Sequence, residues 1–377
     1  MIYLDNAATT YPKPKKVYDE VISSLKTYGG NPGRGAHSLS LAAAEKIYEC
    51  RVALSGLFGL DAPERAVFTL NTTHAINTVI KGILRQGDHV LISDLEHNSV
   101  FRPIYRLACE GFIKYSVFPT FAGKNHTDED ILDGINSRIN MKTRLVFCTH
   151  ASNICSEILP IKKIGELCRK RGIVFAVDAA QSAGHLPIDM QAFCIDALCV
   201  PGHKGLYGPQ GCGALLLGEN IMLDTLTEGG NGVSSLEGKM PELPPERYEA
   251  GTLPTPAIAG LCEGIREVRA LGTDKIRSHE AALFRYARSK LSEIGGIKMY
   301  APDAEGSVLL FNSEKLPSDE LGELLNKSGI CIRTGYHCAA LAHKTLGTPS
   351  GGAARISFGI YNTFEDIDAL YEALKKI

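Results

Sequence analysis

The chain of 377 residues lacks three features that would each indicate a particular class of protein. No apolar run approaches the roughly 18–20 residues of a membrane-spanning helix, and the first residues, MIYLDNAATTYPKP, lack the basic-then-apolar form of a signal peptide. Neither sign of charge is in excess, since 40 Lys and Arg stand against 42 Asp and Glu. Such a balance gives no electrostatic footprint for nucleic acid or an anionic membrane, so we expect a small molecule or a protein as the partner.

The cysteines are also arranged in a way that argues against two kinds of site. There are 11 of them, an odd number, and none forms a CxxC pair. This pattern disfavours a disulfide framework and a structural zinc site, so we expect no metal and a reducing, cytoplasmic location. Cys148, Cys168, Cys194 and Cys199 lie in apolar-periodic segments and are expected to be inert core thiols.

Segments typical of strands and of helices alternate between Arg65 and about Leu217. Short apolar runs such as AVFTL, HVLIS, RLVFCTH and GIVFAVD are separated by helix-like stretches such as IKKIGELCRKRG. This alternation predicts a mainly parallel sheet with crossover helices, in a three-layer α/β lobe. The chain is longer than one hydrophobic core usually covers. After a loop-like stretch at 228–256 and two long helices predicted over 257–294, the remainder is typical of a smaller α+β lobe.

Two of the apolar runs end on an acid and on a lysine. Asp178, with Gln181 just beyond it, ends GIVFAVD, and His203-Lys204 follows DALCVPG. In open α/β sheets ligands bind beyond the carboxyl ends of the strands, and pyridoxal phosphate needs a Lys Schiff base and a carboxylate on its pyridinium nitrogen. Taken singly, Asp178 could start a turn and Lys204 could be a solvated loop residue. The ordered pair, with Gly on both flanks of His203-Lys204, predicts a pyridoxal phosphate site.

Further positions could support such a site, although each also has an ordinary structural explanation. Thr72 and Thr73 begin a predicted amphipathic helix, where free N–H groups favour a phosphate or where a hydroxyl simply caps the helix. His97 follows a strand, where an imidazole could stack on a planar ring, move protons or be structural. Asn153 follows another strand and could donate a hydrogen bond to a ring oxygen or form a turn.

Motifs along nearly the whole chain resemble, in order, those of cysteine desulfurases, which belong to the class V aminotransferase group. They are YLDNAATT, NPGRGAHSLS, TTHAIN, LEHNS, THASN, VDAAQSAGH, GHKGLYGPQG, RYEAGT, IRTGYHCA and ARISFGIYNT. The form RTGYHCA resembles the group II desulfurase and selenocysteine lyase branch. The resemblance implies PLP fold type I, as in aspartate aminotransferase. A large domain over 14–255 would hold a mainly parallel seven-stranded sheet. A small α+β domain over 1–13 and 256–377 would carry the catalytic Cys and the substrate-carboxylate Arg.

The resemblance also implies which residues bind the cofactor: Thr73, His74, His97, Asn153, Asp178, Gln181, His203, Lys204 and Thr252. Lys204 would form the Schiff base, Asp178 would hold the pyridinium nitrogen, and His97 would stack on the ring. Asn153 and Gln181 would contact the ring-hydroxyl side. Phosphate contacts would come from Thr73, His203 and a helix-start N–H. Thr252 would reach the phosphate of the other subunit's cofactor, which implies a homodimer.

The substrate and the sulfur follow from the same resemblance. Arg355, with Asn153, would bind the substrate carboxylate, a bidentate task that suits a planar guanidinium. Lys204, His97 and Cys338 would be catalytic. Cys338 follows His337 and lies five residues beyond Arg333, an electropositive setting that favours thiolate. Cys331, in the apolar run GICI, is expected to lie in the core.

Two positions depart from the family pattern. Pro201 stands where relatives commonly carry a hydroxyl residue, so one phosphate hydrogen bond is lost or supplied elsewhere. After Cys338 the segment 339–353, AALAHKTLGTPSGGA, is rich in Gly and Thr. The family pattern therefore does not define the surface that would meet a sulfur acceptor.

The resulting hypothesis is a PLP-dependent cysteine desulfurase. It would convert L-cysteine to L-alanine and place the sulfur on Cys338 as a persulfide, for delivery to an acceptor protein. Two alternatives remain open from sequence alone. One is a selenocysteine lyase, which uses the same residues and differs mainly in its need for Cys338. The other is a non-catalytic protein that relays sulfur through Cys338, for which Lys204 would be dispensable.

Overall fold

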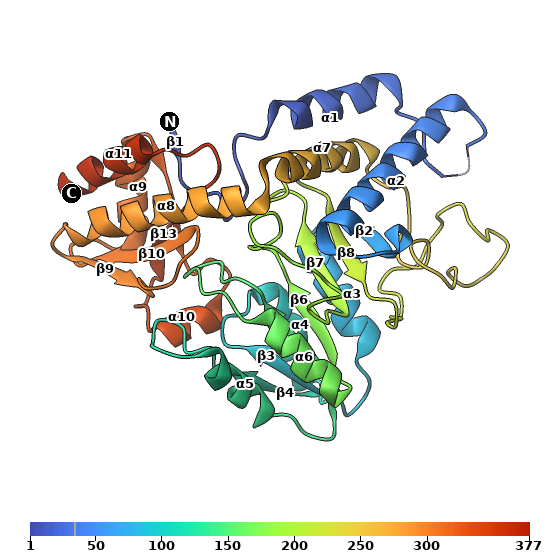
Figure 1. Cartoon of the computed structure of the whole chain (residues 1–377), viewed down its shortest axis with the longest axis horizontal. Coiled ribbons are helices and arrows are strands. Elements are labelled where there is room, and N and C mark those ends of the chain that lie inside the picture. The colour runs from blue at the N-terminus through green and yellow to red at the C-terminus, as the bar shows by residue number, and fades with distance from the viewer. Residues whose placement is uncertain (34) are drawn as a thin grey trace.

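A computed structural model describes residues 1–33 and 35–377; Arg34, in the NPGRGAHSLS motif, lies outside the described residues. Its centre is a seven-stranded sheet (Figure 1). In spatial order the strands are β2 (Ala66–Thr69), β8 (Gly213–Leu217), β7 (Ala197–Pro201), β6 (Val174–Asp178), β5 (Thr143–Thr149), β3 (His89–Ser93) and β4 (Lys114–Phe118). Strand β8 runs antiparallel to both neighbours and the other pairs are parallel. The predicted mainly parallel seven-stranded sheet is thus confirmed.

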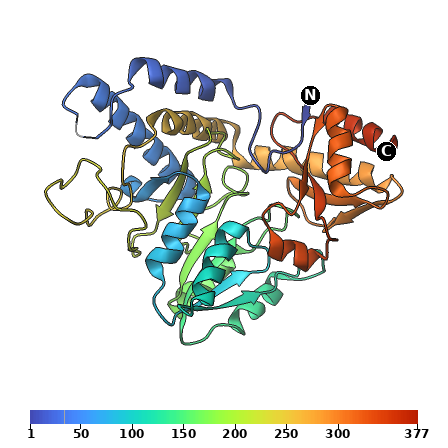
Figure 2. The same cartoon turned by 180° about the vertical axis from the view of Figure 1, so that it is seen from behind.

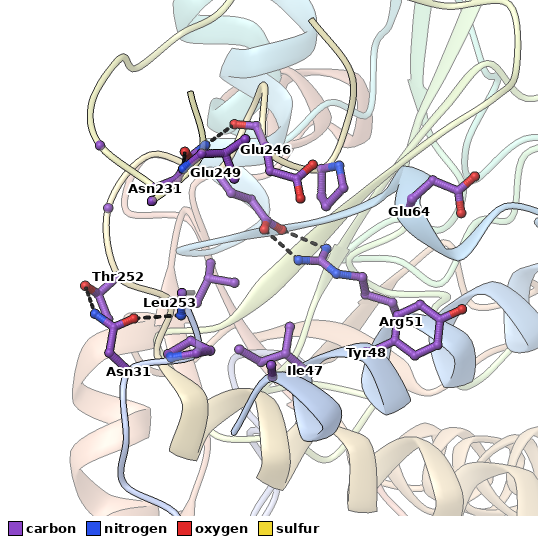
Figure 3. Close-up of a pocket in the computed structure, with 18 residues that line it drawn as sticks. Asn31, Ile47, Tyr48, Arg51, Glu64, Asn231, Glu246, Glu249, Thr252 and Leu253 are labelled. Atoms are coloured by element: carbon purple, nitrogen blue, oxygen red, sulfur yellow. Dashed lines mark hydrogen bonds and ion pairs between the residues drawn. The ribbon is translucent and has the colours of Figure 1, made fainter. Parts of the chain in front are cut away.

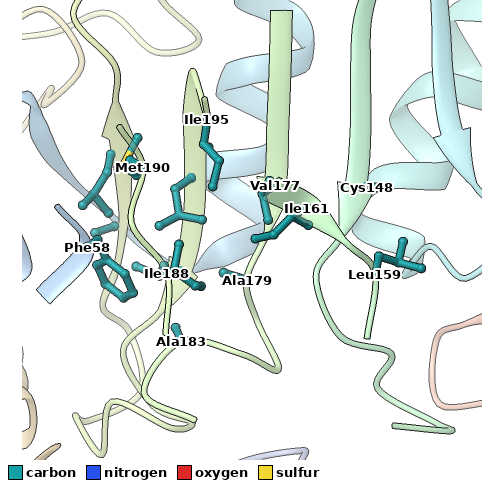
Figure 4. Packing of buried hydrophobic residues seen from close by; sticks show 14 of the residues in the cluster. Phe58, Cys148, Leu159, Ile161, Val177, Ala179, Ala183, Ile188, Met190 and Ile195 are labelled. Atoms are coloured by element: carbon teal, nitrogen blue, oxygen red, sulfur yellow. The ribbon is translucent and has the colours of Figure 1, made fainter. Parts of the chain in front are cut away.

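Helices cover both faces of this sheet. They are α1 (Lys15–Thr27), α2 (Ser38–Phe58), α3 (Thr72–Ile83), α4 (Asn98–Cys109), α5 (Asp128–Asn136), α6 (Ile161–Arg171) and α7 (Thr255–Leu271), with a short 3-10 turn at Pro63–Arg65. Side chains alternate along each strand: Leu198 and Val200 face a core shared with α2, α5, α6 and α7, whereas Ala197 and Cys199 face α3. Figure 4 shows part of the first core, to which Phe58, Val177 and Ile188 belong. This is the predicted three-layer arrangement.

A smaller lobe is built on a four-stranded antiparallel sheet. Its strands, in order, are β12 (Arg333–Gly335), β13 (Ala353–Ser357), β10 (Val308–Ser313) and β9 (Ile297–Tyr300). Helices of this lobe are α8 (Thr273–Ser292), α9 (Ser318–Lys327), α10 (Ala340–Leu346) and α11 (Phe364–Lys375). The first strand, β1 (Ile2–Tyr3), pairs with β11 (Ile330–Cys331), so both ends of the chain lie on this lobe (Figure 2). The Gly- and Thr-rich segment 339–353 contains helix α10.

The described part of the chain contains neither a membrane-spanning helix nor a disulfide. No helix in it is long and apolar enough to span a bilayer. All 11 cysteines are free, and Cys148, Cys168, Cys194 and Cys199 are buried as predicted. Burial raises the pKa of the Cys148 and Cys199 thiols well above their ordinary value, which keeps them protonated and inert.

Candidate active site

A cavity of about 320 Å³ lies at one edge of the large sheet, beside the small lobe. Strands β3, β5, β6 and β7 are parallel, so their carboxyl ends meet at this edge. All but two of the predicted site residues line this cavity. The residues that line it are Thr73, His97, Asn153, Asp178, Gln181, His203, Lys204, Cys338 and Arg355. The residues outside it are His74 and Thr252.

Lys204 and Asp178 both line the cavity and affect each other electrostatically. Asp178 is the last residue of β6 and is 2% exposed, with its Oδ1 accepting a hydrogen bond from the N–H of Ala180 at 2.9 Å. Burial raises the pKa of the Asp178 carboxyl, while the Ala180 N–H and Lys204 oppose this. Burial lowers the pKa of Lys204 to about 8, although Asp178 raises it. About a tenth of Lys204 is therefore a neutral amine at pH 7, far more than for an ordinary lysine, and able to act as nucleophile or base.

His97 is fixed in one tautomer at the start of α4. Its Nδ1 accepts a hydrogen bond from the N–H of Ser99 at 3.1 Å, and Ser99 Oγ lies 2.8 Å from the same atom. An accepting Nδ1 leaves the proton of a neutral imidazole on Nε2. Burial, together with the charges of Lys204 and Arg102, lowers the pKa of His97 to about 4. His97 is therefore a neutral ring with one N–H to donate.

The start of α3 and His203 supply donors at another side of the cavity. Asn71 caps α3 by accepting from the N–H of His74 at 2.9 Å. Thr72 and Thr73, the first two residues of α3, line the cavity, and their N–H groups have no partner within the helix. Burial, Lys204 and Lys13 lower the pKa of His203 to about 4, so the ring is neutral. Its Nδ1 is buried without a hydrogen-bond partner among the described residues. A helix start and an unpaired ring nitrogen suit an anionic group.

Arg355 is held between the two lobes and already has an anionic partner. It lies on β13, is 2% exposed, and donates from Nη1 to the carbonyl of Asn153 at 2.9 Å. Its Nη2 donates to Asp5 Oδ1 at 2.7 Å, while Nε is buried and unpaired within the described part of the chain. Sequence reasoning missed Asp5, which also lies 3.7 Å from Arg333. An incoming carboxylate would share the guanidinium with Asp5 or displace it.

Cys338 is exposed at the mouth of the cavity. It also borders a neighbouring groove of about 380 Å³ that contains Lys81, Arg102 and Arg106. Both Cys338 and its neighbour His337 have left-handed backbones, with φ of 54° and 50°. The main-chain carbonyl of Cys338 accepts a hydrogen bond from the N–H of Asn98 at 2.7 Å. The thiol is thus presented on a turn that is held by a large-lobe helix.

Other groups that support the site gave no signal in the sequence. Lys13 Nζ donates to the carbonyl of His203 at 2.6 Å, and Thr9 Oγ1 donates to the same carbonyl at 3.0 Å. The N-terminal segment thereby fixes the backbone next to Lys204. Glu96, in the LEHNS motif, is fully buried, and its Oε1 accepts from the N–H of Thr149 at 2.9 Å. Burial raises the pKa of Glu96 to about 8, so it is mainly protonated at neutral pH.

The two predicted residues outside the cavity have other neighbours. The ring of His74 turns back, and its Nδ1 accepts from the N–H of Leu70 at 3.3 Å. Thr252 lines a second cavity of about 750 Å³ (Figure 3), where its Oγ1 accepts from Asn31 Nδ2 at 3.3 Å. Thr252 therefore does not reach the cavity of its own chain. A buried ion pair between Arg51 and Glu249, 2.6 Å apart, lines this second cavity.

The residues of the first cavity fit pyridoxal phosphate. Lys204 offers an amine of lowered pKa, and Asp178 keeps one carboxylate oxygen clear of the Ala180 N–H. The unpaired Nδ1 of His203 and the start of α3 match a phosphate, and the unpaired Nε of Arg355 matches a carboxylate. Pro201 ends β7 without a hydroxyl, so a phosphate contact at that position is lacking.

Comparisons with known proteins agree with this geometry. The sequence model described as Aminotransferase class-V matches residues 2–370. A relative in Methanothermobacter thermautotrophicus named "Probable cysteine desulfurase" is 36% identical over 384 residues, which cover 100% of this chain and 94% of the relative. A protein of Yersinia pestis (strain Pestoides F) named cysteine desulfurase is 34% identical over 387 residues, covering 100% of this chain and 93% of that protein. The apo structure of cysteine desulfurase from Thermococcus onnurineus NA1 superposes with a TM-score of 0.90 at 30% identity, covering 100% of this chain and 94% of that one. Because the family model and these relatives span nearly its whole length, the chain belongs to the class V aminotransferase family, in its cysteine desulfurase group.

Proposed function

We propose that this protein is a PLP-dependent cysteine desulfurase that converts L-cysteine to L-alanine and transfers the sulfur to Cys338. The observation that carries the proposal is a single cavity that brings together Lys204, Asp178, Arg355 and Cys338 from both lobes. Each group has a task in this reaction, whereas a non-catalytic sulfur relay would need only the cysteine. When bound, pyridoxal phosphate supplies an electrophilic aldehyde and a ring that withdraws electrons from the α-carbon of the substrate.

Six groups would hold the cofactor and the substrate in this proposal. Lys204 would hold the aldehyde group, and the Asp178 carboxylate would bind the ring nitrogen and keep it protonated. His97 would contact the ring, and the start of α3 with His203 would bind the phosphate. The Arg355 guanidinium binds the carboxylate of cysteine. This is a stronger contact than a neutral hydrogen bond because both partners are charged.

Proton transfer and sulfur transfer then fall to separate residues. Lys204 Nζ, whose pKa is about 8, takes the α-proton and later returns it to the α-carbon, so that alanine keeps its α-hydrogen. The Cys338 thiolate attacks the substrate sulfur, so that a sulfur–sulfur bond forms while the bond between Cβ and sulfur breaks. The electron pair of the broken bond stays on Cβ, which takes a proton and becomes the methyl group of alanine. Cys338 is left as a persulfide, and an acceptor protein would remove the outer sulfur.

Thr252 supports a homodimer with shared sites. It lies beside Asn31 in the second cavity and outside the cavity of its own chain, as expected of a residue that serves a partner's phosphate. The 11 free cysteines support the proposed cytoplasmic location, because thiols persist in reducing compartments.

The function is tested by measuring alanine formation from L-cysteine for the wild type and for Cys338→Ser. We expect the variant to bind cysteine through Arg355 and to lose desulfuration, because a serine hydroxyl is a far poorer nucleophile toward sulfur than a thiolate. Selenocysteine serves as the comparison substrate, since selenium leaves more easily than sulfur. Normal alanine formation from cysteine by Cys338→Ser would contradict the proposal. The absence of the yellow colour of bound cofactor in the wild type would favour the relay.

A further inference from the structure

The turn that carries Cys338 has an unusual backbone. His337 and Cys338 are consecutive non-glycine residues with φ of 50° and 54°. A side chain in this left-handed region crowds the backbone, so such residues persist only where their surroundings fix them. Two hydrogen bonds to main-chain carbonyls contribute: Asn153 Nδ2 donates to His337 at 2.9 Å, and the N–H of Asn98 donates to Cys338 at 2.7 Å. Neither bond fixes the side chain of His337.

The ring of His337 has two neighbours that restrain it: its Nε2 lies 3.5 Å from the carbonyl of Arg333, and a second histidine holds Nδ1 at a shorter distance. His343, on α10, places Nε2 3.2 Å from His337 Nδ1. The two rings are nearly parallel, at 8° with centroids 5.4 Å apart, and the residues are 3% and 6% exposed. His343 is itself fixed, because its Nδ1 lies 2.8 Å from Thr348 Oγ1 and the ring of Tyr336 packs on its edge. A chain of contacts therefore runs from Thr348 through both rings to the residue before Cys338.

The pair works as a hydrogen bond as long as at least one ring is neutral. One ring nitrogen must donate and the other accept, and two imidazolium rings would place two donors against each other. Burial, the Arg355 charge and His343 lower the pKa of His337 to about 3. Burial also lowers the pKa of His343. The restraint therefore holds throughout the neutral pH range.

We propose that His343 is a positioning residue for sulfur transfer: through the ring of His337 it holds the left-handed turn that presents Cys338 to the cavity. This inference rests on the proposed function, because it assigns Cys338 the role of sulfur acceptor. His343 touches neither cofactor nor substrate and acts only through His337. The Cys338 thiolate must approach the substrate sulfur opposite the carbon–sulfur bond, so a turn free to change its direction would slow this step.

The test uses two substitutions of His343 in the holoenzyme and a control on the same helix. His343→Phe keeps a ring of similar shape against His337 but removes the hydrogen bond. His343→Gln places an amide near the position of Nε2 and can restore it. Lys344→Ala alters an exposed neighbour of His343 on α10. Persulfide on the Cys338 peptide is followed by mass spectrometry after mixing with cysteine, and the kcat and KM for cysteine are measured in parallel.

We expect persulfide formation and kcat to fall about tenfold in His343→Phe, equivalent to about 1.4 kcal/mol for one buried hydrogen bond. The KM for cysteine should stay within about twofold, because Arg355 is unchanged, and His343→Gln should recover most of the rate. Selenocysteine turnover should change little in either variant. Alkylation of Cys338 by iodoacetamide, which needs no cofactor, should become faster in His343→Phe as the turn opens.

The outcomes separate this inference from the function on which it rests. If the wild type carries no sulfur on Cys338 after cysteine, the proposed function itself fails. If the wild type carries it and His343→Phe matches its persulfide and alkylation rates, only the role of His343 is refuted. Equal loss in the Gln and Phe variants would also refute it, since packing and not the hydrogen bond would then matter. Should His343→Phe not fold, Thr348→Val releases the other side of His343. It should slow persulfide formation about threefold, and an unchanged rate would refute the role.

Discussion

Replacing Lys204 by methionine should stabilise the cofactor-free protein, because the wild-type chain buries an ammonium in the cavity. The pKa of Lys204 is about 8 in the folded protein against an ordinary 10.5. That difference corresponds to about 3 kcal/mol of unfolding free energy, or about 2 kcal/mol once the water that reaches the cavity is allowed for. The folded pKa is the lower one, so between pH 8 and 10.5 the unfolded chain binds more protons and wild-type stability rises with pH.

The measurement is urea unfolding of cofactor-free wild type and Lys204→Met at pH 7 and pH 10.5. We expect the variant to be more stable by about 2 to 3 kcal/mol at pH 7, where the penalty is fully present, and the gap to close almost completely at pH 10.5. The exposed Lys315→Met serves as control and should show no such gap at either pH. A gap that is absent at pH 7, or that persists unchanged at pH 10.5, would refute the burial argument and with it the lowered pKa assigned to the base.

Two further results test the cofactor site and its sharing between subunits. Asp178→Asn should fold and bind the cofactor but lose about 100-fold in turnover, because the preorganised anion at the ring nitrogen is gone; near-normal steady-state turnover would exclude the role. Thr252→Val should weaken phosphate binding about tenfold, and mixing it with the inactive Lys204→Ala should restore activity, because in the mixed dimer one site has both residues intact. No recovery on mixing would mean that Thr252 does not act across subunits.

The strands of the large sheet can be predicted from local sequence patterns, with the exception of one strand at its edge. Most strands are continuous apolar runs because both faces are covered, and those runs are visible in the sequence. Strand β4 (Lys114–Phe118) lies at the sheet edge, and only Phe118 is fully buried there, so KYSVF carries no strong apolar signal. Helix α10 could not be predicted for a related reason: ALAHKTL is only seven residues long and is followed by Gly and Thr, so its stability depends on tertiary contacts.

The candidate site shows the same division between local and long-range information. Asp178 and Lys204 are recognisable because each follows its own strand, and parallel strand ends meet at one edge. The pairing of Asp5 with Arg355 joins positions 350 residues apart and needs the fold to be seen. The stacking of His337 on His343 likewise depends on how α10 packs. Sequence spacing of six residues does not by itself bring two rings together.

The central claim is that Cys338 accepts sulfur from cysteine, and the most direct measurement is the mass of the peptide that contains it. Wild-type holoenzyme is exposed briefly to L-cysteine without a reductant, digested and analysed by mass spectrometry. We predict one added sulfur on the Cys338 peptide, together with an equivalent amount of alanine, and no added sulfur in Cys338→Ser. Added sulfur on the Cys331 peptide, or alanine formed with no sulfur on Cys338, would contradict the claim.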